Sequence, residues 1–148
     1  PGMPYSLLLS RSVDFDPFFM LFQAEYPDQR DITLWMTLLQ QVWDGADPGG
    51  TARLFNEDPL DGVAHEVLIQ NALGDYQVTT LGAHNMARAY GADMIDPVVR
   101  EVWGVETQAG PFVGNGIVDY DFGNPEPYEN VPPEDLDDDP HSGTLKNF

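Results

Sequence analysis

Residues 65–91 read HEVLIQNALGDYQVTTLGAHNMARAYG, and they indicate the fold class more clearly than any other segment. It begins with a short apolar run, Val67-Leu68-Ile69, of the kind found in strands buried on both faces. We predict a strand within residues 63–72, ended by a Gly74-Asp75 turn. A helix follows, from a threonine cap through Tyr90, with a glycine at its end. Strand, turn and helix in this order form half of a parallel-sheet crossover unit, which predicts an α/β fold.

Two apolar helices are expected upstream of this unit. Asp16-Pro17 offers an N-cap followed by a proline at the first helical position, which predicts a helix over residues 17–26. Residues 31–43 place large apolar side chains at helical spacing on one face, the clearest helical pattern in the chain. Residues 44–61 are rich in Gly, Pro, Asp and Asn and predict a loop with at most a short helical turn.

Downstream of the unit, two further strands are predicted, over residues 98–105 and 117–122, separated by glycine-rich turns. Residues 124–140 are rich in proline and acidic residues and lack apolar periodicity. They predict a long exposed loop, which a compact domain tolerates mainly where the loop has a function.

The composition narrows the classes of function. Twenty-five acidic residues face six basic ones, for a formal charge of −19, so binding to nucleic acid or to an anionic membrane surface is not expected. Such a bias suits a protein of salty surroundings or an exported one, and export is slightly favoured. Cysteine is absent, which excludes disulfides and thiolate chemistry. The longest apolar stretch, residues 18–22, is too short to span a bilayer.

The most informative side chain is Asp75, because functional residues of open α/β sheets gather at the carboxyl ends of strands. Gly74-Asp75, with Val78 three residues beyond and a helix after it, resembles the segment of α/β-hydrolases that supplies the acid of the catalytic triad. In that family the triad runs Ser, then Asp or Glu, then His along the chain. His141 stands in the place of the family's histidine.

The resemblance extends to the order of elements over nearly the whole chain. It implies a partial α/β-hydrolase-like sheet made of the last strands, with a helical cap over about residues 16–44. Residues 63–91 would then be the acid-bearing strand, turn and helix. Residues 98–148 would hold the last strands and the histidine loop, and the whole chain would be one C-terminal part of the hydrolase domain.

The activity that the resemblance implies is that of an esterase or lipase-like serine hydrolase, in which His141 acts as general base and Asp75 orients it. No G-x-S-x-G motif is present, and the four serines lack the context of a nucleophile. We therefore expect a fragment, which begins abruptly at Pro1-Gly2, with the nucleophile on an upstream segment or separate chain. That N-terminal half and a small ester or acyl substrate are the expected partners; no cofactor or metal is expected.

The same residues also allow purely structural, non-catalytic interpretations. Asp75 alone fits a helix-start aspartate that satisfies backbone N–H groups, and His141 alone fits a solvated residue near a terminus. His84 is expected to be exposed on the polar side of its helix. The aromatic residues at helical spacing are expected to form core rather than a ligand pocket, and part of them to form a contact surface for the N-terminal half if that half is absent. They are Phe18, Phe19, Phe22, Trp35 and Trp43.

Two motif matches are weaker. Asp121-Phe122-Gly123 matches a kinase metal-binding triplet in letters only, since no accompanying kinase motif is present. Asp135, Asp137 and Asp139 alternate as in a calcium loop but lack the required glycine and the bidentate glutamate.

The sequence leaves two other classes of function open. One is a non-catalytic hydrolase-like module for binding or assembly, with an acidic surface as its interaction feature. The other is a free-standing small acidic domain whose likeness to hydrolases is coincidental.

Overall fold

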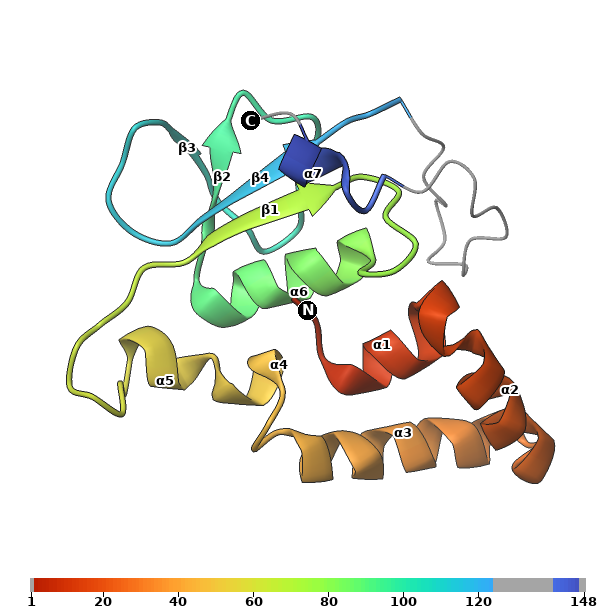
Figure 1. Ribbon diagram of the computed structural model, residues 1–148. Helices are drawn as coiled ribbons and strands as arrows, with labels where there is room; N and C mark the ends of the chain where they lie inside the picture. Colours follow the sequence, from red (N-terminus) through yellow and green to blue (C-terminus); the bar gives the residue numbers. More distant parts are fainter. Residues whose placement is uncertain (1, 124–139, 147–148) are drawn as a thin grey trace.

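The computed structural model describes residues 2–123 and 140–146. Helices and a four-stranded, all-parallel sheet make up the described part, so the predicted α/β class is confirmed (Figure 1). In chain order the elements are α1 (Tyr5–Arg11), the 3-10 helix η1 (Val13–Phe15), α2 (Asp16–Glu25), α3 (Gln29–Trp43), α4 (Pro48–Thr51), α5 (Arg53–Asn56), β1 (Leu68–Ala72), α6 (Thr80–Tyr90), β2 (Asp93–Asp96), β3 (Thr107–Ala109), β4 (Gly116–Tyr120) and α7 (Gly143–Lys146).

The sheet has the strand order β1-β4-β2-β3. β1 pairs with β4 along its full length, from Leu68 opposite Gly116 to Ala72 opposite Tyr120. β4 also pairs with β2, and β2 pairs with β3 at the far edge. The strand that comes last along the described chain therefore lies inside the sheet, next to the strand that precedes Asp75.

Helix α6 lies between the sheet and the helical layer made by α1, α4 and α5 (Figure 1). Its Ala83 and Ala87 pack with Met94 of β2 and Ile117 of β4 in the buried core. On another side of the helix Gly82 meets Met3, whose side chain is completely buried. These three small residues of α6 let neighbouring segments approach the helix closely.

The predicted helices are confirmed with small shifts of their ends. α2 and α3 begin one and two residues before the predicted starts, and α6 covers the predicted segment to Tyr90. Asp28 caps α3 by accepting the Arg30 N–H at 2.9 Å, and Gly91, in the left-handed conformation, ends α6. The predicted loop over 44–61 contains two four-residue helices, α4 and α5.

The predicted strands needed more correction. Residues 98–105 form no strand; strands β2 and β3 lie on either side of them. Val98, Val102 and Val105 are apolar because they pack from a loop against the core. The run at Val67 lies at a sheet edge rather than being buried on both faces, and Leu68 is 60% exposed.

The expectation that the aromatic residues of α2 and α3 form core was wrong for the described part of the chain. None of the five is buried: Phe18 is 61% exposed and Trp35 38%, and the other three are half-buried. Tyr26 links two of them, because its ring centroid lies 5.0 Å from that of Phe22 and 5.5 Å from that of Trp35.

Candidate functional site

Strands β1 and β4 set the position of the candidate site. They are parallel neighbours, so their carboxyl ends, at Ala72 and Tyr120, meet at the same edge of the sheet. Asp75 follows β1 by three residues, after Gly74, whose φ of 81° makes the tight turn possible. The placement of Asp75 at the end of a parallel strand agrees with the sequence prediction.

The Asp75 carboxylate divides its two oxygens between different partners. Oδ1 accepts the backbone N–H groups of Gln77 at 2.8 Å and Val78 at 2.9 Å. Oδ2 lies 2.9 Å from Nδ1 of His141. Helix α6 begins later, with Thr79 as its N-cap, so Asp75 is not the cap of this helix. The structure therefore brings the two predicted site residues together across 66 positions of sequence.

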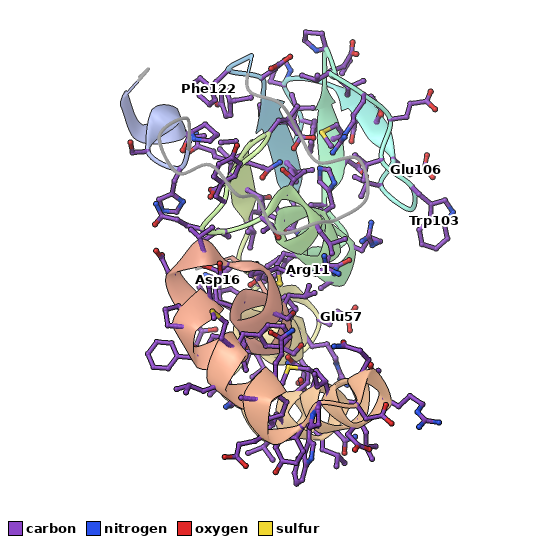
Figure 2. All side chains as sticks on the ribbon, turned by 90° about the vertical axis from the view of Figure 1, so that its right-hand side faces the viewer. Arg11, Asp16, Glu57, Trp103, Glu106 and Phe122 are labelled. Atoms are coloured by element: carbon purple, nitrogen blue, oxygen red, sulfur yellow. The ribbon has the colours of Figure 1, made fainter. Side chains whose placement is uncertain are left out.

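His141 is held by the turn that begins the last described segment. The Gly143 N–H donates to the Pro140 carbonyl at 2.6 Å, and α7 starts directly afterwards. The Phe122 ring lies so close to Gly143 that a Cβ there would meet ring carbons at 2.8–3.1 Å. Figure 2 shows Phe122 beside this short helix. Packing of Phe122 on Gly143 thus ties the histidine segment to the end of β4.

The two side chains differ in their exposure to solvent. Asp75 has 8% of its side chain exposed, whereas His141 has 40% exposed. Burial raises the pKa of the Asp75 carboxyl above its ordinary value, against the opposing effects of the Val78 N–H, the His141 ring and the Gln77 N–H. A buried carboxyl beneath a solvent-facing imidazole can fix the ring and stabilise a proton that the ring takes up.

No protein-family model, curated protein or solved structure matches this chain. The assignment of a function to this chain therefore depends on the chemistry of its own residues.

A second pair of aspartate and histidine lies under the sheet, and sequence reasoning missed it. His84 of α6 places Nε2 at 2.9 Å from Oδ2 of Asp119 on β4, and Asn71 of β1 donates its side-chain N–H to Oδ1 of Asp119 at 2.7 Å. The Asp119 side chain is 1% exposed and that of His84 is 9% exposed. The prediction that His84 is exposed was wrong, because α6 is covered on more than one side. The available signal was a carboxylate within the apolar strand GIVDY.

The three buried groups join the elements that carry the site. Asn71 and Asp119 are direct partners in the β1–β4 register, and His84 attaches α6 to Asp119 of β4. Asn71 lies four residues before Asp75 on the same strand and loop. We therefore assign this cluster a structural role behind the Asp75–His141 pair.

The two weaker motif matches of the sequence do not form a functional site among the described residues. Asp121 accepts the Gly123 N–H at 2.7 Å, which is a local turn. The alternating aspartates at 135, 137 and 139 lie outside the described residues. Within residues 2–123 and 140–146, no group of three or more ligating side chains forms a metal site. The helices of this part are also too short or too polar to cross a membrane.

Proposed function

We propose that this chain is the C-terminal part of an esterase or lipase-like serine hydrolase with the α/β-hydrolase fold. Asp75 is its orienting acid and His141 its base. The nucleophilic serine and the oxyanion hole belong to a segment upstream of these residues. The order of acid before histidine, on segments that follow adjacent parallel strands, supports this assignment.

The single observation that carries the proposal is that the two oxygens of the Asp75 carboxylate have different partners. Backbone N–H groups hold Oδ1, so the orientation of Oδ2 toward His141 is fixed. The contact uses Nδ1, and a carboxylate oxygen can only accept a hydrogen bond. The ring therefore donates its Nδ1 proton to Asp75 and carries its lone pair on Nε2. This is the tautomer that a general base for a serine hydroxyl requires.

The reaction then follows from proton balance. Nε2 of His141 takes the serine proton as the hydroxyl oxygen attacks the ester carbonyl, and Asp75 stabilises the imidazolium that forms. The imidazolium next gives the proton to the leaving alcohol, so the ester C–O bond breaks and an acyl-enzyme remains. In the second step, hydrolysis of the acyl-enzyme, His141 deprotonates a water molecule that attacks the acyl carbonyl. The bond to serine then breaks, and His141 returns the proton to the serine.

The test uses the polypeptide in which this chain is joined to its upstream segment. We expect that segment to contain G-x-S-x-G, and its serine to react with a fluorophosphonate probe and to hydrolyse short p-nitrophenyl esters. His141→Gln should abolish labelling and turnover. Asp75→Asn should lower kcat by a factor on the order of 10⁴, the effect of a wrong tautomer.

Matched controls come from an exposed pair of the same residue types. His65 and Asp61 lie 3.0 Å apart with half of each side chain exposed. His65→Gln and Asp61→Asn should therefore leave turnover unchanged. Full activity of a folded Asp75→Asn protein would refute the catalytic assignment. An upstream segment whose elbow serine is replaced, with no probe labelling, would instead support a non-catalytic module for binding or assembly.

A further inference from the structure

The helical layer contains a groove that the hydrolase proposal does not use. It has a volume of about 680 Å³ and lies between α1, α2 and α3. Its apolar wall includes Phe19, Ile32 and Met36, and Arg11 lines it from the last turn of α1. Figure 2 labels Arg11 and Asp16 on the side of the molecule where α1 and α2 meet. The volume is within the range of about 300–1,000 Å³ for sites that bind small molecules.

Arg11 is unusual because its charge has no counterpart. The chain has 25 acidic residues and six basic ones, so acidic partners are abundant. Arg30 pairs with Asp28, Arg53 with Glu57, and Arg88 donates to the Trp103 carbonyl at 3.0 Å. The Arg11 side chain, although the residue is half-buried, makes no hydrogen bond or ion pair with any residue in the described ranges. Burial lowers the pKa of its guanidinium, which reflects the cost of desolvating an unpaired charge.

Among the described residues that line the groove, Arg11 is the only charged side chain, and three of the hydroxyl groups already serve as donors within their own helices. The hydroxyls of Ser10, Thr33 and Thr37 donate to backbone carbonyls four residues earlier, at 2.8–2.9 Å. One guanidinium beside an apolar wall therefore matches a ligand with one negative charge and an apolar chain.

We propose that this groove binds an amphipathic monocarboxylate. The carboxylate accepts two parallel N–H bonds from the Arg11 guanidinium, whose planar fork fits that geometry. The aliphatic chain lies along Phe19, Ile32 and Met36, where it covers apolar surface. The site does not depend on Asp75 or His141, so it stands whether or not the chain forms part of a hydrolase.

Calorimetric titration of the 148-residue chain with octanoate tests the proposal, with octan-1-ol as the uncharged probe of equal length. We expect one octanoate to bind, and at least about tenfold tighter than the alcohol, a difference of ~1.4 kcal/mol. Arg11→Gln should remove this preference without lowering Tm, because Arg11 has no partner to lose. Arg30→Gln is the matched control, and it should leave octanoate binding unchanged because Arg30 is exposed and lies outside the groove.

A second variant tests the other wall of the groove. Thr37 is an exposed residue that lines the groove, so Thr37→Trp should fill the groove and weaken both probes. Absence of octanoate binding would overturn the proposal. Equal binding of octanoate and octan-1-ol would also overturn it, as would an Arg11→Gln protein with unchanged preference for octanoate.

Discussion

At the scale of single residues, the Asp75 carboxyl is buried, although the proposed reaction requires it to be ionised. Its side chain is 8% exposed, yet it supports an imidazole that gains a proton in the proposed reaction. The two N–H groups of Gln77 and Val78 supply fixed partners that replace water on one oxygen. A carboxyl held in this way keeps its direction whether or not His141 is charged.

The raised pKa of Asp75 predicts a sign for the pH dependence of stability. Between the unfolded value of about 3.9 and the higher folded value, the folded state binds more protons than the unfolded state. The free energy of unfolding therefore falls as pH rises through this window. The effect is measured by urea unfolding, over a range of pH, of the His141→Gln variant and of the His141→Gln, Asp75→Asn double variant. Both lack the titrating imidazole of His141. The curves of the two variants should differ by this Asp75 contribution, and parallel curves would contradict the assignment.

Asp47 supplies a control of opposite sign. Its burial opposes ionisation, but the N–H groups of Gly50, Gln40, Tyr5 and Gly49 together lower the pKa of its carboxyl. Its contribution to stability is thus present above the ordinary aspartate pKa and is lost as pH falls through the lowered value. Asp47→Asn should cost about 1–3 kcal/mol at neutral pH and less in acid.

Both members of the Asp75–His141 pair were predicted from the sequence. Their signals, a Gly74-Asp75 turn after an apolar run and a histidine downstream, can be read from residue order alone. It missed the role of His84 for a physical reason. The prediction assumed that a helix has one polar face open to water. α6 is covered by the sheet and by Met3, so its polar face meets Asp119 instead of solvent.

At the scale of elements, the sequence predicted helices α2, α3 and α6 and strands β1 and β4, but it did not predict helices α1 and α7 or strands β2 and β3. α3 shows apolar residues at helical spacing over four turns, which few other structures explain. β2 and β3 have the sequences DMID and TQA, with no apolar run to detect. The valines of the loop between them gave a false signal, because a loop that packs on a core needs apolar side chains as much as a strand does.

The contact of α6 with the N-terminal segment gives a prediction about Gly82. Alanine favours a helix over glycine by about 1 kcal/mol. A Cβ at position 82, however, would overlap with the buried Met3 side chain, so Gly82→Ala should destabilise the chain by about 1–3 kcal/mol. Chemical denaturation measures this change. Combining the substitution with Met3→Ala should recover part of the loss, and Gly45→Ala, where no atom lies within 4 Å, should have little effect.

The buried cluster of Asn71, His84 and Asp119 gives a second prediction for the packing of elements. Asp119→Ala leaves two buried polar side chains without their partner and should cost about 3–5 kcal/mol. In a double-mutant cycle with His84→Ala, the combined loss should be smaller than the sum of the single losses. Additive losses would show that His84 and Asp119 do not stabilise each other.

At the scale of the whole molecule, an acidic chain exposes a large amount of apolar surface on two helices. The exposed side chains of α2 and α3 are Phe18, Met20, Leu21, Leu34, Trp35, Leu38 and Val42. Exposed apolar surface of this kind is typical of contact regions. It is the surface on which the proposed upstream half of the hydrolase would pack.

This surface predicts binding of a hydrophobic fluorescent dye by the isolated chain. Replacing Leu21 and Val42, which are 69% and 77% exposed, by glutamate should reduce the dye signal and keep the fold. The same change at Leu60 and Val113, which are 86% and 89% exposed outside these helices, keeps the total charge equal and should reduce the signal less. Equal signals from the two double variants would argue against a dye site on α2 and α3.

The position of β4 inside the sheet has a consequence for synthesis on the ribosome. β1 is made early, and in the described structure its only partner in the sheet is β4, which ends at Tyr120. The edge of β1 that pairs with β4 therefore stays open in the nascent chain while more than forty further residues are added. The acid-bearing loop after β1 gains its final support only when the neighbouring strand emerges, so the loop and the histidine segment are assembled at nearly the same time.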